Sequence, residues 1–241
     1  MCNCDFNSLP PWEQLFKRVL WAQLGDLRGK RILDFGSGIG VTACHYAAEN
    51  EVIAVEHSAE SVAKRWDEHP YRQIIGSTEV LRQMEDGSFD VIFCHNVLEY
   101  VPDRAEALKE FHRLLKPDGF VSLVKHHRPG RVMQMVVLLN EFPKANALLD
   151  GADGSSADYG AIHYYEDEDV TEGFRIKETY GIRTFWDLQQ KQDCHTDPAW
   201  QEKMIEMELR VARLQPYRDI AFFHHLILDK KDVQPNETRS F

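Results

Sequence analysis

The stretch that most constrains this chain of 241 residues is residues 31–40, where an apolar run ends at an acid and enters a glycine-rich turn. Its sequence is RILDFGSGIG, and residues 41–48 continue it with a helical pattern. A strand, a glycine loop and a helix in this order form a nucleotide-binding unit. Because glycine has no Cβ, the backbone of such a loop can approach a ligand closely.

The spacing of the glycines discriminates between classes of nucleotide. The dinucleotide pattern G-x-G-x-x-G fits Gly36 and Gly38 but places Val41 third, while the extra glycine is Gly40. A Walker loop requires a lysine after its last glycine, and this sequence lacks it. Asp34 would repel an incoming pyrophosphate. The pattern therefore favours a ligand with a cationic group and no phosphates, such as S-adenosylmethionine.

The rest of the chain indicates an α/β fold. Apolar runs and amphipathic segments alternate along residues 31–124 as strand, helix, strand, helix. This order predicts a doubly wound parallel sheet with ligands at the carboxyl ends of its strands. Before the first strand, apolar residues recur at helical spacing from 12 to 24 and predict an N-terminal helix. Lys17 and Arg18 on that helix are interpreted as part of its solvated face.

These features resemble the class I S-adenosylmethionine-dependent methyltransferases. D-x-G-x-G-x-G after a strand looks like motif I of that family, and further segments match in family order at residues 52–56, 76–77, 89–92 and 115–120. The resemblance covers residues 30–125. It implies a Rossmann-like, mostly parallel seven-stranded sheet with an antiparallel final strand. It also implies S-adenosylmethionine as cofactor, with S-adenosylhomocysteine as the product.

We interpret the whole chain, residues 1–241, as one methyltransferase domain. Residues 1–29 are expected to form an N-terminal helical cap, and residues 30–125 the cofactor-binding half. The alternation of strands and helices stops after residue 125, so residues 126–170 are expected to be an inserted helical lid over the site. Residues 171–241 are expected to supply the C-terminal strands and a helix.

Candidate cofactor-binding residues gather at the ends of the expected strands. Glu56 ends the second strand twenty residues after Gly36, which suits a carboxylate that accepts hydrogen bonds from ribose hydroxyls. The ring of His57 is placed to touch the adenine, and the hydroxyls of Ser77 and Thr78 to bind its edge. The full predicted set is Asp34, Gly36, Ser37, Gly38, Gly40, Glu56, His57, Ser77, Thr78 and His95.

A closer likeness is to the bacterial tRNA 5-carboxymethoxyuridine methyltransferases, and it rests on residues 95–101, 180–187 and 216–217. It implies cofactor contacts for four of the residues above, namely Glu56, Ser77, Thr78 and His95. The likeness weakens at residues 125–128 and 150–165, which are expected to face the methyl acceptor. The sequence therefore does not identify that acceptor.

The acceptor is expected to be an anionic, carboxylate-bearing small molecule or a modified tRNA nucleoside. Arginine can bind a carboxylate bidentately, and the basic candidates are Lys125, Arg128, Arg131 and Arg183. A hydroxyl or amine acceptor would need a general base instead, for which the candidates are His126, His127 and His163. The predicted catalytic residues are Arg128, Arg183 and His126. No metal site is predicted, because adjacent histidines on a strand point in different directions.

Composition limits the partners and the location of the protein. The formal net charge is −11, so tRNA stays open as a partner but is not favoured. No apolar run approaches the roughly 18–20 residues that span a bilayer, and the first residues do not resemble a signal peptide. The five cysteines form an odd count. We therefore expect a cytoplasmic protein with reduced thiols and no membrane partner, and the oligomeric state stays open between a monomer and a weak dimer.

Two classes of function remain open. The first is a methyltransferase, and the second is a non-catalytic domain that binds S-adenosylmethionine or S-adenosylhomocysteine. An NAD-dependent oxidoreductase is disfavoured by Val41 in the third glycine place. The intact set of acid and glycines favours the enzyme.

We expect the protein to bind S-adenosylmethionine and S-adenosylhomocysteine with dissociation constants of low-micromolar order, and not to bind NAD. The reason is the acid-and-glycine turn followed by Glu56. Isothermal titration calorimetry with the three ligands tests this. Tight binding of NAD without binding of S-adenosylmethionine would contradict it.

Overall fold

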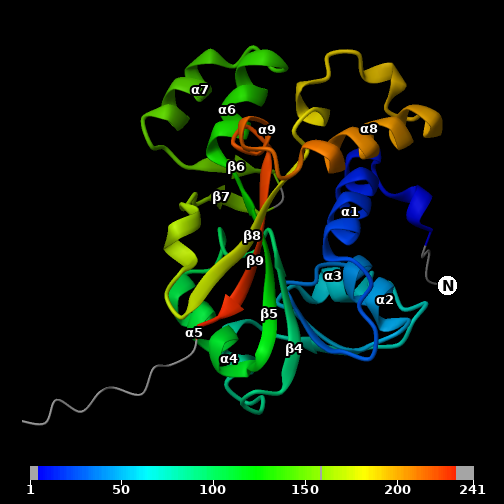
Figure 1. The fold of residues 1–241 in the computed structure, drawn as a ribbon, viewed down its shortest axis with the longest axis vertical. Coiled ribbons are helices and arrows are strands. Elements are labelled where there is room, and N and C mark those ends of the chain that lie inside the picture. The colour runs from blue at the N-terminus through cyan, green and yellow to red at the C-terminus, as the bar shows by residue number, and fades with distance from the viewer. Residues whose placement is uncertain (1–4, 158, 232–241) are drawn as a thin grey trace, which may run out of the picture.

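The computed structural model describes residues 5–157 and 159–231, which form a seven-stranded sheet with helices on both faces (Figure 1). The strand order is β3-β2-β1-β4-β5-β9-β8. The first five strands in this order run parallel to one another, whereas β9 is antiparallel to both β5 and β8. The predicted fold class is thus confirmed. The strands are β1 (Arg31–Phe35), β2 (Glu51–Glu56), β3 (Arg72–Ile75), β4 (Phe89–His95), β5 (Leu115–His126), β8 (Phe174–Ile182) and β9 (Phe223–Lys230).

Helices connect these strands. The α-helices are α1 (Pro11–Leu24), α2 (Val41–Ala47), α3 (Ala59–Ala63), α4 (Thr78–Leu81), α5 (Arg104–Leu114), α6 (Arg128–Val137), α7 (Phe142–Leu149), α8 (Pro198–Val211) and α9 (Gln215–Arg218). The 3-10 helices are η1 (Phe6–Ser8), η2 (Asp167–Val170), η3 (Trp186–Leu188) and η4 (Gln192–Cys194). A short hairpin of β6 (Gly154–Ser156) and β7 (Gly160–Ile162) forms a separate two-stranded sheet.

The central strands are apolar on both faces because helices cover both. On one face, Phe111 and Leu108 of α5 pack against β1, β4 and β5, and the Phe111 ring lies 5.3 Å from that of Phe35. On the other face, α1, α2 and α8 pack on the sheet. Because both faces are buried, the strand sequences are continuous apolar runs in which apolar and polar residues do not alternate.

The order of the strands reverses between β1 and β4, which places a crevice at their carboxyl ends. Phe35 of β1 is in register with Cys94 of β4 and with Val55 of β2. The residues that follow, from Gly36, Glu56 and His95 onward, therefore lie at the same edge of the sheet. Ligands of doubly wound folds bind at such a switch point.

The N-terminal helix lies across the antiparallel half of the sheet. Pro11 opens α1 at a position where its missing N–H costs nothing, and Gly25, with φ of 70°, ends it. Its buried stripe packs against Val124, Ile182 and Phe223. The helix predicted before the first strand is therefore present, and its packing fixes which residues it turns toward the crevice.

Residues between β5 and β8 form the helical insertion that the sequence predicts. In Figure 1, α6 and α7 lie together at one end of the molecule, beside α9. A Cβ on Gly130 would lie 2.0 Å from the Ala221 carbonyl oxygen, so only glycine allows α6 to start this close to the segment that leads into β9. The insertion is helical as expected, and its action as a lid stays a prediction.

Two further sequence expectations concern cysteines and membranes. Cys44, Cys94 and Cys194 are free thiols, whereas Cys2 and Cys4 lie outside the described residues. None of the helices within residues 5–157 and 159–231 has the length and apolarity to cross a bilayer.

Candidate active site

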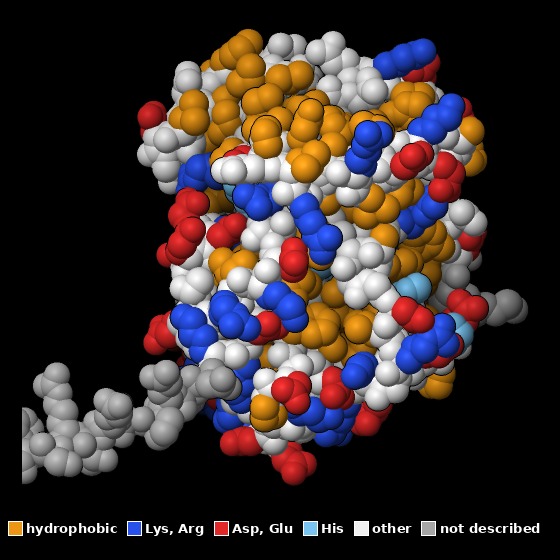
Figure 2. Space-filling model, viewed as in Figure 1, with side chains coloured by type: hydrophobic (Ala, Val, Ile, Leu, Met, Phe, Trp, Pro, Cys, Tyr) orange, Lys and Arg blue, Asp and Glu red, His pale blue; other side chains and the backbone are white. Residues whose placement is uncertain are grey.

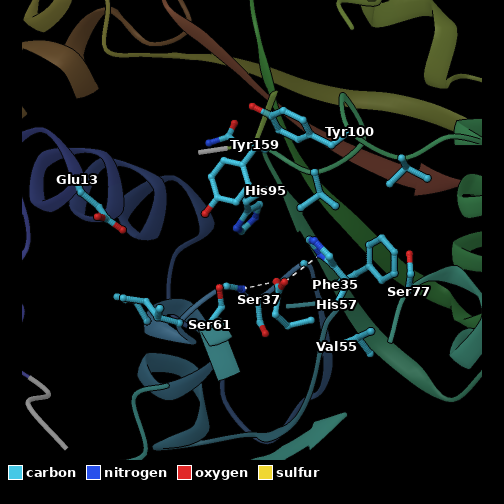
Figure 3. A pocket seen from close by; sticks show the side chains of 18 of the residues that line it. Glu13, Phe35, Ser37, Val55, His57, Ser61, Ser77, His95, Tyr100 and Tyr159 are labelled. Atoms are coloured by element: carbon cyan, nitrogen blue, oxygen red, sulfur yellow. Dashed lines mark hydrogen bonds and ion pairs between the residues drawn. The ribbon is translucent and has the colours of Figure 1, made fainter. Parts of the chain in front are cut away.

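A pocket of about 720 Å³ opens at the carboxyl ends of β1, β2 and β4, under the start of α1 (Figure 3). This volume lies within the usual range for a small-molecule site. Its wall combines the glycine turn with aromatic and charged side chains. The lining includes Trp12, Glu13, Phe16, Lys17, Phe35, Gly36, Ser37, Gly38, Glu56, His57, Gly76, Ser77, His95, Asn96, Tyr100, Tyr159 and Phe223.

The glycine turn uses most of its N–H groups within the protein. The amides of Gly36 and Ser37 donate to Val55 O at 2.8 and 3.1 Å, and that of Gly38 donates to the Glu56 carboxylate at 2.8 Å. Gly36 has φ of 77°, and a Cβ there would lie 2.3 Å from a methyl group of Val97. The turn thus presents a flat backbone surface with few free donors. A pyrophosphate requires such donors, so the geometry agrees with a ligand that carries no phosphates.

Glu56 joins the glycine turn to the end of β2. Its side chain is buried, one oxygen accepts from Gly38 N and the other accepts from Ser58 N, both at 2.8 Å. The His57 ring approaches the second oxygen at 3.0 Å (Figure 3). A carboxylate can accept about four hydrogen bonds, so Glu56 keeps capacity for ligand hydroxyls while it holds the turn.

Asp34 lies beneath the turn and does not line the pocket. It is buried, and one of its oxygens has no hydrogen-bond partner. Burial raises the pKa of Asp34 to about 7, and the positive charge of Lys17 opposes that rise. Asp34 does not line the cavity, and its effect on the pocket is through its charge interactions with Lys17 and Glu56.

Helix α1 turns two opposite charges toward the pocket. Glu13 and Lys17 are one helical turn apart and both line the cavity. Lys17 Nζ donates to Thr42 Oγ1 at 2.8 Å, and it is the one lysine or arginine among the described residues that line the cavity. Burial lowers the pKa of Lys17, while the charges of Glu13 and Asp34 oppose that shift. The sequence interpretation of Lys17 as solvated was wrong, although opposite charges four residues apart could have indicated a shared face.

Comparison with known proteins agrees with this geometry. Residues 33–123 match the model of the methyltransferase domain family. The tRNA 5-carboxymethoxyuridine methyltransferase of Escherichia coli is 26% identical in an alignment that is 241 positions long. The alignment covers 90% of this chain and 88% of that protein. Residues 33–123, the cofactor-binding half of the sheet, are thus similar to a methyltransferase domain.

Two further proteins resemble this chain over different lengths. The ubiquinone biosynthesis O-methyltransferase of Alkalilimnicola ehrlichii is 39% identical over 127 residues, 49% of this chain and 51% of that protein. A solved S-adenosylmethionine-dependent methyltransferase from Mesorhizobium loti has a TM-score of 0.55 at 16% identity, covering 94% of this chain and all of the other. The second comparison shows a shared fold.

The structure brings most of the residues predicted to bind the cofactor into one pocket. Those that line it are Gly36, Ser37, Gly38, Glu56, His57, Ser77 and His95. Asp34, Gly40 and Thr78 do not line it. Gly40 instead begins α2 with φ of 74°, and a Cβ there would lie 2.0 Å from the Tyr71 hydroxyl oxygen.

The three residues predicted to be catalytic lie outside the lining of the cavity and have protein partners. Arg128 donates to the carbonyls of Leu148 and Ala152 at 2.9 and 2.7 Å, at the end of α7. Arg183 forms a buried two-pronged ion pair with Asp187. Each guanidinium thus has a local structural role.

His126 and Lys125 are each held by a carboxylate, His126 by that of the buried Glu99 and Lys125 by that of the partly buried Asp167. The His126 backbone N–H donates to Glu99 at 2.6 Å, and its ring lies 3.1 Å from the same oxygen. Lys125 is 1% exposed and pairs with Asp167 at 2.9 Å. Of the four basic candidates for an anionic acceptor, Arg128 and Arg131 have no ion-paired carboxylate in the described part of the chain, and the Arg131 guanidinium donates to Gln134 Oε1.

The raised pKa of Asp34 predicts a dependence of stability on pH. An unfolded aspartate titrates near pH 4, so between about pH 4 and 7 the folded state binds more protons and stability falls as pH rises. Asp34→Asn removes this dependence. Relative to wild type, the variant should gain about 1–3 kcal/mol of unfolding free energy between pH 5 and 8, measured by urea denaturation.

Asp118→Asn is the control for this experiment, since Asp118 is exposed. Its stability difference from wild type should stay constant over the same pH range. A constant difference for Asp34→Asn as well would show that this carboxyl group is already charged at pH 5, paired with Lys17.

Proposed function

We propose that this protein transfers a methyl group from S-adenosylmethionine to a carboxylate-bearing acceptor. The observation that carries the first half is one pocket that holds Glu56 at one side and the Glu13–Lys17 pair at another. Glu56 suits the two ribose hydroxyls, because a carboxylate accepts both. Lys17 and Glu13 suit the carboxylate and the ammonium group of the methionine part, which carry opposite charges.

The residues of the pocket mainly position the reactants. S-adenosylmethionine supplies, when bound, a methyl group on a positively charged sulfur that leaves readily. A carboxylate acceptor needs no general base at neutral pH, so the protein has to hold it in line and exclude water. Trp12, Tyr100 and Tyr159 provide an aromatic wall for this purpose. The Tyr100 and Tyr159 rings lie 5.6 Å apart, and Tyr159 comes from the hairpin of the insertion.

Residual positive charge beside the pocket supports an anionic acceptor. The Arg183 guanidinium lies 5.2 Å from the rings of both Trp12 and Phe223, which line the cavity. Arg131 lies close enough for the charges of Asp187 and Arg183 to act on its pKa, which burial lowers. Two guanidinium groups therefore lie near one carboxylate, that of Asp187, which is ion-paired with Arg183 alone, so the three side chains together carry a net positive charge. Such a charge favours a carboxylate on the acceptor.

The relatives also favour a carboxylate. The E. coli protein named for 5-carboxymethoxyuridine in tRNA matches over 90% of this chain and 88% of its own. The ubiquinone biosynthesis enzyme matches about half of this chain. Charge does not favour a large nucleic-acid surface, since Lys and Arg side chains are interspersed with acids on the face in Figure 2. We therefore propose the carboxylate as the recognised group, on the nucleoside or on a small acid.

We expect Lys17→Met to weaken the binding of S-adenosylmethionine by about 10- to 100-fold, the usual scale for a lost hydrogen bond to a charged group. Arg18→Met is the matched control, because Arg18 is the next residue of α1 and pairs with Glu202 at the surface. An exposed ion pair of this kind contributes little. Calorimetry measures both affinities, and equal affinities would show that Lys17 does not hold the cofactor.

We expect radiolabelled methyl groups to pass from S-adenosylmethionine to tRNA that carries 5-carboxymethoxyuridine, or to the free nucleoside. Arg131→Gln should lower kcat/KM for this acceptor by about 10- to 100-fold with unchanged cofactor affinity. Arg210→Gln, on the exposed side of α8, is the control. Transfer of methyl groups to phenols alone would contradict the proposal that the acceptor bears a carboxylate. Binding of the cofactor without transfer to any acceptor would support the non-catalytic alternative.

A further inference from the structure

A chain of hydrogen bonds leads from the pocket through the sheet to α1. His95 Nε2 lies 2.9 Å from Ser122 Oγ, which lies 2.9 Å from His225 Nε2. His225 Nδ1 lies 2.8 Å from Gln23 Oε1, and Gln23 Nε2 donates to Gly181 O at 3.1 Å. Ser122 and His225 are completely buried. The side chains come from β4, β5, β9 and α1, so the chain crosses three adjacent strands.

The contacts of Gln23 decide which atom donates and which accepts in each of these hydrogen bonds. Since the Gln23 amide nitrogen donates to Gly181 O, its oxygen faces His225 and must accept from Nδ1–H. Burial lowers the pKa of His225 to about 3, so its ring is neutral and Nε2 carries a lone pair. The Ser122 hydroxyl therefore donates to His225 Nε2. The same oxygen then accepts from His95 Nε2–H.

The Nδ1 atom of His95 is a hydrogen-bond acceptor for which the described part of the protein supplies no donor. Burial also lowers the pKa of His95 well below its ordinary value, so its ring is neutral and carries a single proton, on Nε2. Its Nδ1 is buried and has no hydrogen-bond partner in the described part of the protein. Buried acceptors are nearly always satisfied. Because His95 lines the pocket, a donor on a bound ligand can fill this place.

We propose that Gln23, His225 and Ser122 hold His95 as the Nε2–H tautomer, and that His95 Nδ1 accepts a hydrogen bond from the ammonium group of S-adenosylmethionine. The inference rests on the proposed function. It makes Gln23, His225 and Ser122 positioning residues, because they act on the ligand only through His95.

The cofactor offers three kinds of donor, and position selects the ammonium group. Glu56, which suits the ribose hydroxyls, ends β2, and β1 lies between β2 and β4. His95 ends β4 on the other side of β1, where the charge of Lys17 acts on its ring. Lys17 is the group proposed to hold the methionine carboxylate. The ammonium group is bonded to the same carbon as that carboxylate, so it belongs at the same side of the pocket.

Nitrogen NMR of protein labelled with ¹⁵N-histidine tests the tautomer directly, because protonated and unprotonated ring nitrogens resonate far apart. His95→Gln identifies the signals. We expect Nδ1 of His95 to be unprotonated in the free protein and to shift when S-adenosylhomocysteine saturates the site. We expect no shift with 5′-methylthioadenosine, which keeps the ribose hydroxyls and the adenine amino group but lacks the amino-acid part.

Three results would overturn the inference: a protonated Nδ1, a resonance that S-adenosylhomocysteine leaves in place, or an equal shift with 5′-methylthioadenosine. Calorimetry on the same sample separates the failures. If S-adenosylhomocysteine does not bind at all, the proposed function is wrong, and the contact between His95 and the ammonium group is wrong as well. If it binds and the resonance stays in place, the inference about His95 fails alone.

Variants of Gln23 test the positioning role without disturbing the buried strands. Gln23→Leu should give a mixture of His95 tautomers and weaken S-adenosylhomocysteine binding by about 2- to 10-fold. Gln23→Glu keeps an acceptor for His225 Nδ1–H and should keep the single tautomer. Gln14→Leu is the matched control, because Gln14 on the same helix donates to backbone carbonyls and contacts no histidine. A single tautomer with unchanged affinity in Gln23→Leu would refute the role.

Discussion

The packing of α1 on the antiparallel half of the sheet is the contact on which the pocket depends. Leu15, Phe16, Val19 and Leu20 are buried against β5, β8 and β9, which fixes the rotation of the helix about its axis. That rotation turns Glu13 and Lys17 toward the crevice. The glycine turn and Glu56 make only part of the wall, so the pocket is complete only with the side chains of this helix.

The sequence predicted the parts of the fold that depend on local pattern. Strand periodicity, the spacing of the glycines and the acid at Glu56 are features of short segments, and the structure places all of them at one edge of a doubly wound sheet. The role of Lys17 could not be read in this way. Its exposure depends on a helix that packs against strands more than a hundred residues later in the chain, and periodicity carries no information about that contact.

The basic residues show a second limit of the sequence. The basic residues near the end of β5 and Arg183 predicted a free positive surface, but two of the four, Lys125 and Arg183, are paired with carboxylates. Asp187, four residues after Arg183, could have been anticipated as its partner. Asp167 lies forty-two residues after Lys125 and also binds His224, so only the fold reveals that pair. Ion pairs across distant segments decide which cations stay available, and they are invisible to residue spacing.

The position of β9 has a consequence for how the chain is made. This strand, residues 223–230, lies between β5 and β8, although it follows both in sequence. During synthesis, the edges of β5 and β8 that pair with β9 therefore stay unpaired until β9 has been synthesised. Unpaired edges invite pairing with other chains. A ribosome that stalls before residue 223 would leave a nascent chain whose parallel half is formed but whose sheet cannot close, and such a chain is a natural client for chaperones.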